Sequence, residues 1–248
     1  MNRRTTLAKT TAGIAVGTLA LALTGCGGSH TNPARPADAA GPATTSPSTA
    51  VPPSLTGPAL RAVLPTAADL AKGVNVSGDY DTGTSFTAPT DLPAPALPGA
   101  DCTAAPAIDA DVLTGDYRAA YASEEIDNTG NSLQLVAAAT NPGDAAKLLA
   151  EIRDFAKRCA SFTAPDSAGS SVGGTVELDS FAGIGDEAIR IRVTAAGPNA
   201  AKYSQPEVIL VRVGDKIAAV SDADQAHDEA AAVVVAKFLA GRLAGQPL

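Results

Sequence analysis

Three arginines are the residues of this sequence whose type and spacing best fit a ligand site. Arg190 and Arg192 alternate within one predicted strand, and Arg212 lies in a later strand that we expect to be adjacent. Guanidinium groups bind carboxylates and phosphates in a bidentate way, so three on one sheet face would bind a small anionic ligand. The alternative is cross-strand pairing with Glu177 and Glu207 on a solvated face. Since both interpretations leave the arginines exposed, replacing Arg190 and Arg192 by Glu is expected to change stability by at most about 0.5 kcal/mol.

A glycine-containing segment fits the spelling of a nucleotide-binding loop. Gly183, Gly185 and Ala188 match G-x-G-x-x-A. In a dinucleotide-binding loop these glycines open a helix whose N-terminus faces the pyrophosphate. Here Asp186 and Glu187 follow and lead into a predicted strand, so two carboxylates would repel a phosphate and no helix dipole would attract it. We therefore interpret Gly183 and Gly185 as turn residues that precede a strand.

A histidine with acidic neighbours suggests a metal site or a catalytic base. His227 stands between Asp222 and Asp224 on one side and Asp228 and Glu229 on the other. Acidic residues in the first turn of a helix are explained by the helix dipole alone, and His227 falls on the apolar face of that predicted helix. No G-x-S-x-G nucleophile motif accompanies it. We expect a structural histidine and no enzyme; a hydrolase is the weakest function hypothesis.

Two aspartates near the start of the domain begin like a calcium loop. Asp79 and Asp81 are spaced like the first ligands of an EF-hand, whose last position is a bidentate glutamate. Thr90 occupies that last position in this sequence, so the match fails. The sequence therefore predicts no metal site and no cofactor.

The N-terminus has the features of an exported lipoprotein. A basic segment around Arg3 and Arg4 precedes an apolar segment at 14–23, which is too short for a membrane-spanning helix of about 20 residues. The run LTGC at 23–26 resembles a bacterial lipobox, which implies that residues 1–25 are a signal peptide and that Cys26 is diacylated. Two acyl chains give a stable membrane anchor. The alternative is a plain secretory signal with an unrelated cysteine; export by Sec or by Tat stays open.

Residues 26–58 are predicted to be a disordered tether between the lipid and a folded domain at 59–248. The tether is rich in Gly, Ser, Thr, Pro and Ala with almost no large apolar residues, so it cannot bury enough surface to fold. A coil of about 30 residues spans roughly 30 Å. We expect the domain to stand away from the membrane, on the extracytoplasmic face of the cell membrane.

The composition narrows the choice of partners. The chain has a formal net charge of −8, and removal of the basic signal peptide makes it more negative. Nucleic acid is excluded because phosphate neutralisation needs basic patches. The sequence has no Trp, 4 Tyr and 5 Phe, which disfavours sugar binding by ring stacking. The expected partners are the membrane, through the lipid anchor, and a small anionic ligand or an envelope protein.

The periodicity of apolar residues predicts an α+β fold. Period-two alternation and turn residues predict strands at 112–126, 131–139, 172–178, 187–193, 207–213 and 216–220. The run NPGD at 141–144 starts a first main helix, which ends near Cys159. A second helix closes the chain, and its predicted buried face consists of His227, Ala231, Val234, Val235 and Phe238. We expect an antiparallel β-sheet with two main helices packed on one face.

Several short motifs are distributed over 60–243. They are Leu64-Pro65, Ala68-Asp69-Leu70, Cys102, RCASF at 158–162, AGIGDEA at 182–188 and RVGD at 212–215. Together they resemble the extracellular sensor domain of PknH-type receptor serine/threonine kinases of actinobacteria and the free-standing lipoproteins related to it. The resemblance implies a non-catalytic, sensor-like domain outside the cell. It does not identify a ligand.

Cys102 and Cys159 are expected to form a disulfide bond. In the resemblance they correspond to paired cysteines, the second of which closes a helix. With Cys26 acylated they are the two remaining thiols in an oxidising compartment. Cys159 also lies on the apolar face of its predicted helix, where it points toward the sheet. The alternative is two buried free thiols.

Two function hypotheses from different classes follow. The first is a membrane-anchored extracytoplasmic lipoprotein with a sensor-like ligand-binding domain, and the second is a scaffold lipoprotein that binds another envelope protein. A pocket of a few hundred Å³ would favour the first. A flat exposed apolar patch would favour the second.

Replacing Cys26 with Ala is expected to release the protein from membranes or to leave it as an uncleaved precursor, because the residue that carries both acyl chains is lost. Membrane fractionation with immunoblotting measures both outcomes. Wild-type processing and wild-type membrane association of the variant would contradict the lipoprotein interpretation.

Overall fold

The fold is built from the C-terminal part of the chain. The computed structural model describes residues 55–83, 102–128, 131–165, 171–197, 200–223 and 229–245. The predicted signal peptide, Cys26 and most of the predicted tether lie outside these ranges, as do His227 and Thr90. The first helix begins at Gly57, so the described fold includes the last residues of the segment that we predicted as tether.

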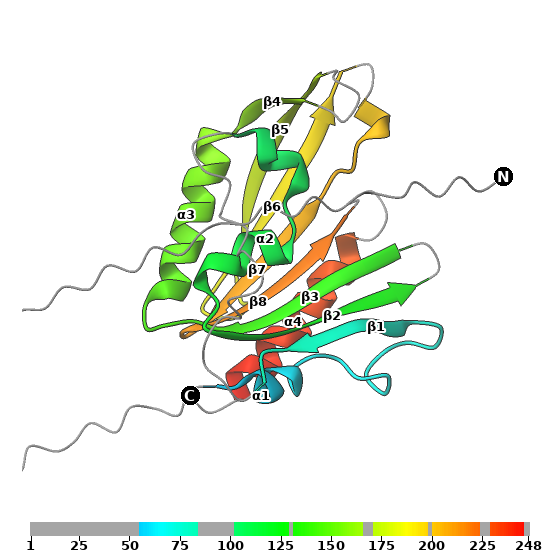
Figure 1. Cartoon of the computed structure of the whole chain (residues 1–248), viewed down its shortest axis with the longest axis vertical. Coiled ribbons are helices and arrows are strands. Elements are labelled where there is room, and N and C mark those ends of the chain that lie inside the picture. The colour runs from blue at the N-terminus through cyan, green and yellow to red at the C-terminus, as the bar shows by residue number, and fades with distance from the viewer. Residues whose placement is uncertain are drawn as a thin grey trace, which may run out of the picture. The chain divides into compact units, whose positions relative to one another are not determined.

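An antiparallel sheet is the centre of the molecule (Figure 1). Its strands are β1 Asn75–Asp81, β2 Ala120–Asn128, β3 Asn131–Ala139, β4 Ser161–Pro165, β5 Ser171–Phe181, β6 Glu187–Ala196, β7 Glu207–Val213 and β8 Lys216–Asp222. Their spatial order is β1-β2-β3-β8-β7-β6-β5-β4, and every neighbouring pair is antiparallel. The last strand of the sequence therefore lies in the middle of the sheet.

The two α-helices that come first in the chain are short, and the two that follow are long. The α-helices are α1 Gly57–Arg61, α2 Ala110–Thr114, α3 Asp144–Arg158 and α4 Glu229–Gly245, and the 3-10 helices are η1 Cys102–Ala107, η2 Gly115–Tyr117 and η3 Ala200–Lys202. This arrangement confirms the predicted α+β class with an antiparallel sheet. None of the described helices is both long and apolar enough to cross a membrane.

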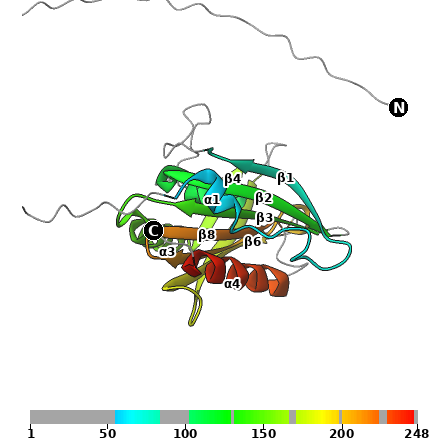
Figure 2. The same ribbon diagram turned by 90° about the horizontal axis from the view of Figure 1, so that it is seen from below.

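The two main helices cover opposite faces of the sheet, so our prediction that both pack on one face was wrong. Val136, Leu210 and Ala219 belong to the core under α3. Their chain neighbours, among them Leu135 and Ile209, belong to the core under α4. Because side chains alternate along a strand, strands that are apolar at every position need cover on both sides. In Figures 1 and 2, α4 lies along one side of the strands, and in Figure 1 α2 lies in front of them.

The predicted buried face of the last helix was wrong at Val234, whereas Ala231, Val235 and Phe238 are partly buried against the core under α4. Val234 is 66% exposed, whereas Ala232, Ala236, Leu239 and Leu243 are buried against the sheet. The helix consists largely of Ala and Val on all sides, so its sequence has little contrast between an apolar and a polar face. Small alanines on the buried side let the helix approach the strands closely.

Some element boundaries differ from the prediction. The predicted strand at 112–126 begins instead with residues of α2 and η2, and β2 starts only at Ala120. The N-cap of α2, Asp109, accepts a hydrogen bond from the Val112 N–H at 2.6 Å. Helix α3 begins at Asp144 with Gly143 as N-cap, in the left-handed conformation, rather than with Asn141. Strands β1 and β4 were not predicted. Both are edge strands, and β1 has a mainly polar sequence (NVSGDYD) without a clear apolar alternation.

The predicted disulfide bond is present. Cys102 at the start of η1 is bonded to Cys159, the residue that caps the C-terminus of α3, with Cα atoms 5.5 Å apart and a sequence separation of 57. Cys159 is fully buried. The bond therefore fastens η1 to the end of α3 on the α3 face of the sheet.

Replacing Cys102 and Cys159 together by Ser is expected to lower the free energy of unfolding by about 4 kcal/mol, since the bond restricts a long loop of the unfolded chain. Urea denaturation of the two proteins measures the difference. Mass spectrometry of the unreduced protein should show the two cysteine peptides linked, and quantitative alkylation of both thiols without reductant would contradict the bond.

Candidate functional site

A pocket of about 410 Å³ opens on the α3 face of the sheet. Strands β2, β3 and β8 supply its floor, the connection from η1 to α2 forms one wall, and the segment between η3 and β7 contributes another part of the wall. The lining residues are Pro106, Ala107, Ile108, Asp109, Glu125, Ser132, Gln134, Ser204, Pro206, Ser221, Asp222 and Ala223. Polar residues lie on the floor, and apolar residues lie mainly in the walls, an arrangement typical of small-molecule sites.

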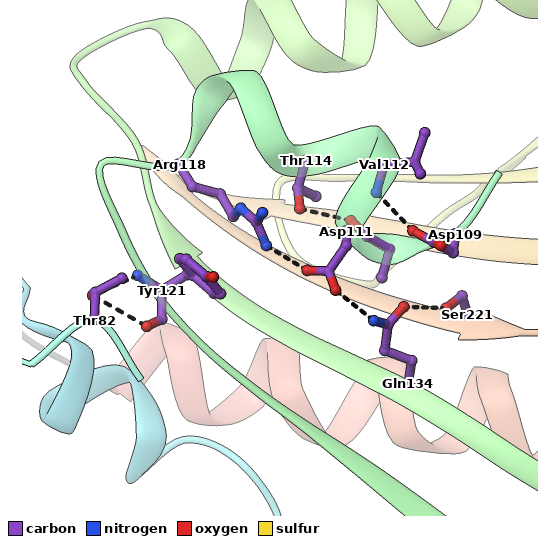
Figure 3. A network of polar contacts seen from close by, with 10 residues as sticks. Thr82, Asp109, Asp111, Val112, Thr114, Arg118, Tyr121, Gln134 and Ser221 are labelled. Carbon is purple, nitrogen blue, oxygen red and sulfur yellow. Dashed lines mark hydrogen bonds and ion pairs between the residues drawn. The ribbon is translucent and has the colours of Figure 1, made fainter. Parts of the chain in front are cut away.

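Gln134 lines the pocket and bridges two partners in a network of polar contacts (Figure 3). Its side-chain nitrogen donates a hydrogen bond to Asp111 at 2.6 Å, and its side-chain oxygen accepts one from the Ser221 hydroxyl at 3.1 Å. Gln134 comes from β3, Ser221 from β8 and Asp111 from α2, so the amide links the sheet to the wall above it. Because both ends of the amide are bonded, its orientation is fixed before any ligand binds.

Arg118 neutralises Asp111 behind the pocket. The Arg118 guanidinium donates to the Asp111 carboxylate at 2.5 Å and lies over the Tyr121 ring, 3.9 Å from its centroid. Only 9% of the Arg118 side chain is exposed. The backbone of Tyr121 is held in turn by hydrogen bonds with Thr82, whose hydroxyl donates to the Tyr121 carbonyl at 3.2 Å (Figure 3). The network therefore fastens α2 to the sheet without placing a cation in the pocket.

Two carboxylates of the pocket lining, Asp109 and Glu125, accept hydrogen bonds from uncharged donors. Asp109 accepts the Val112 N–H as N-cap of α2, and burial, together with the neighbouring Asp111 charge, raises the pKa of its carboxyl group. Glu125 accepts a hydrogen bond from the Ser132 hydroxyl. Among the described residues, those that line the pocket include no Lys, Arg or His. The pocket is therefore acidic, and it differs in charge from the anion site that we expected.

The three predicted arginines do not share a face. Arg190 and Arg192 lie on the α4 face of β6, where Arg192 is directly opposite Glu207 of β7. Arg212 is directly opposite Glu187 of β6. An odd number of positions along the strand separates Glu187 from both Arg190 and Arg192. Because successive residues of a strand point to opposite faces, Arg212 lies on the α3 face. The expectation of one arginine face was therefore wrong.

The arginines pair with carboxylates, as the alternative interpretation stated. Arg190 contacts Asp179 at 2.8 Å and Glu207 at 3.7 Å, and Arg192 contacts Asp179 at 2.9 Å and Glu177 at 3.3 Å. The Arg190 guanidinium also lies over a phenylalanine ring, and its side chain is only 11% exposed rather than solvated. Replacing Arg190 by Glu would bury a like charge beside these acids, so the expectation of near-wild-type stability no longer holds.

On the α3 face, Arg212 of β7 forms an ion pair with the first residue of β6, Glu187. Its Nε contacts Glu187 at 3.3 Å, and Arg153 of α3 contacts the same carboxylate. None of the three predicted arginines lines the pocket. Their role in binding an anionic ligand stays a prediction that is separate from the pocket.

The glycine segment is a turn between β5 and β6, as predicted. Gly183 and Gly185 have φ values of 77° and 59°, which favour glycine. A Cβ atom at Gly185 would lie 2.5 Å from the Arg212 carbonyl oxygen. Asp186 donates its N–H to that carbonyl at 2.9 Å, and its carboxylate accepts the Gly214 N–H at 2.7 Å. The segment therefore locks this turn against the turn between β7 and β8, and it has no contact that would bind a phosphate.

The remaining sequence candidates have structural contacts. Asp79 and Asp81 form ion pairs with Arg61 of α1. No group of three potential metal ligands occurs within the described ranges. One further carboxylate is unusual: Glu124 of β2 is 5% exposed, on the face that α1 and α4 cover, and its Oε1 has no hydrogen-bond partner among the described residues.

Comparisons with known proteins bear on the fold. No protein family model and no curated protein matches the chain. The crystal structure of the extracellular domain of PknH from Mycobacterium tuberculosis is similar, with a TM-score of 0.53 and 13% identity. The similarity covers 78% of this chain and 99% of that domain. The chain therefore shares the fold of that extracellular domain, which agrees with the predicted resemblance at the level of fold.

Glu124 predicts a pH dependence of stability. Burial raises its pKa from 4.5 to about 7, against the opposing effect of Arg61. An acid whose pKa rises on folding stabilises the fold at low pH, and this contribution is lost as the pH rises through the folded-state value. Glu124→Gln is therefore expected to be more stable than wild type at pH 8 and to flatten the decline in stability, which in the wild type takes place between the ordinary pKa of 4.5 and the folded-state value of about 7.

Thermal melts of wild type and Glu124→Gln across this pH range measure the effect. Glu125→Gln, on the exposed neighbouring residue of the same strand, is the matched control and should keep the wild-type profile. An unchanged pH profile in Glu124→Gln would contradict the assignment.

Proposed function

We propose that this protein is a lipid-anchored extracytoplasmic lipoprotein whose sensor-like, non-catalytic domain binds a small ligand in the pocket over β2, β3 and β8. In this proposal residues 1–25 are the signal peptide, Cys26 carries the acyl chains, 26–58 is the tether and 59–248 the ligand-binding domain. The observation that carries the proposal is the pocket itself, with Gln134 fixed on its floor.

The size and construction of the pocket support ligand binding. Its volume of about 410 Å³ lies within the range of small-molecule sites, roughly 300–1,000 Å³. The floor is organised in advance by hydrogen bonds within the protein, so a ligand would meet polar groups that need little rearrangement. The disulfide bond holds η1, and with it Pro106 and Ala107 of the wall.

The hydrogen bonds of the pocket also favour a non-catalytic site. Ser221, a lining hydroxyl, donates to the Gln134 amide oxygen, which is not a base that could activate it. The Ser132 hydroxyl donates to Glu125, and no histidine is among the described residues that line the pocket. The fold shared with the extracellular domain of PknH also supports a sensing role.

One observation favours the alternative of a scaffold lipoprotein that binds an envelope protein. Val76 and Tyr80 on the edge strand β1 are 38% and 41% exposed, and in the described fold β1 pairs with β2 alone. An edge strand with exposed apolar side chains can accept a strand from a partner. In this alternative the pocket is not used.

The proposed function predicts that filling the pocket abolishes ligand binding. Ser204 is an exposed lining residue, so Ser204→Trp should occupy pocket space without disturbing the core. Thermal-shift screening against envelope metabolites should give a compound that raises the melting temperature of wild type by several degrees and has no effect on Ser204→Trp.

Ser161→Trp, at an exposed position of the far edge strand β4, is the matched control and should respond like wild type. Uniform silence of the wild-type protein in the screen, or an equal response of Ser204→Trp, would contradict ligand binding in the pocket and favour the scaffold.

A further inference from the structure

We propose that the ligand of the pocket is a small organic cation, an amine with an aliphatic skeleton, rather than the anion that the arginines suggested. The inference rests on the proposed function and adds the chemical class of the ligand. Three features of the pocket carry it: the sign of its charge, the direction of its hydrogen bonds and the composition of its walls.

The charge of the lining residues is entirely negative. Asp109 lies in the wall and Glu125 on the floor, whereas the side chain of Asp222, opposite Glu207 in the sheet, belongs to the α4 face and does not contribute to this charge. In the part of the chain that the structure describes, no residue that lines the pocket is basic. Arg118, the cation of the adjoining network, is committed to Asp111 and Tyr121 and is nearly buried. An anionic ligand would therefore meet repulsion, and an ammonium group would supply the positive charge that the lining lacks.

The hydrogen bonds inside the pocket leave mainly acceptors for a ligand. The Ser132 hydroxyl donates its proton to Glu125, and the Ser221 hydroxyl donates to Gln134. Each hydroxyl has one proton, so both oxygens face a ligand as acceptors only. The carboxylates of Asp109 and Glu125 are acceptors as well. A ligand that satisfies this lining must bring several donors, and an ammonium group brings up to three.

The walls suit the carbon skeleton of such a ligand. Pro106, Ile108 and Pro206 are apolar lining residues from two different segments of the chain. An aliphatic chain packed against them removes apolar surface from water on both sides. An inorganic cation would gain nothing from these walls, so the structure favours an organic ammonium compound over a metal ion.

The test is a series of compounds with the same five-carbon chain and different charge: 1,5-diaminopentane, 1,5-pentanediol and glutarate. Binding to the full-length protein in zwitterionic micelles is measured by titration calorimetry at low salt. We expect the diamine to bind at least about tenfold more tightly than the diol, with glutarate weakest, and its affinity to fall at high salt.

The variant Asp109→Asn with Glu125→Gln removes both charges and keeps the internal hydrogen bonds. Asn is as good an N-cap as Asp, and the Gln carbonyl can still accept the Ser132 hydroxyl. Diamine affinity should fall about tenfold, because two charge pairs in a partly solvated site are lost. Glu151→Gln with Asp154→Asn, on the exposed side of α3, makes the same charge change and should stay within about twofold of wild type.

Three results would overturn the cation class. Glutarate or the diol binding as well as the diamine, with loss in Ser204→Trp, would leave the pocket as a ligand site and reject the cation. Equal diamine affinity in wild type and in the Asp109→Asn, Glu125→Gln variant, or no binding of the diamine at all, would reject the cation too; the proposed function is then decided separately by the metabolite screen with Ser204→Trp.

Discussion

The rest of the structure depends on the burial of β7 and β8 on both faces. These strands lie in the middle of the sheet, and nearly every side chain along them is buried. Apolar surface on both sides must be covered, so the two long helices are divided between the faces, α3 on one and α4 on the other. On the α3 face the cover changes from the long helix to the short η1 and α2. The pocket lies beside these short elements, where polar residues replace apolar ones on the strands.

The sequence predicted an element correctly where a single local pattern determines it. It did not predict features that depend on strand register, such as the sheet face on which a side chain lies. Strand β7 was predicted with its observed bounds, because its apolar run is bounded by turn residues. The placement of the helices failed although the two-sided apolar pattern of β7 was visible in advance. The face of Arg212 depends on its pairing with Glu187, and a shift of one residue would reverse it. The pocket was missed because its lining comes from segments far apart in the chain; Gln134 and Ser221, polar residues within apolar strands, were the available signal.

Charged side chains on the two faces of the sheet differ in how they are paired. On the α4 face, Arg190 and Arg192 are paired with carboxylates of the neighbouring strands, so their charge is balanced inside the protein. On the α3 face, Arg118 balances Asp111, while Asp109 and Glu125 line the pocket and accept hydrogen bonds from uncharged groups. Charges that form ion pairs within the protein stabilise the positions of strands and helices. Carboxylates without an ion pair can gain electrostatic interaction energy when a cationic ligand binds. This difference separates residues that hold the fold together from residues that would recognise a ligand.

The position of β8 has a consequence for how the chain reaches its native state. β8 follows every other strand in the sequence, yet it joins β3 to β7. Until it is in place, β1–β3 and β4–β7 are separate half-sheets, each with an open apolar edge. Such edges pair readily with other chains, and contacts between residues far apart in sequence form slowly. Newly made chains are therefore most exposed to aggregation and proteolysis just before their last strand is synthesised, and a nascent chain that stalls there has no complete core to protect it.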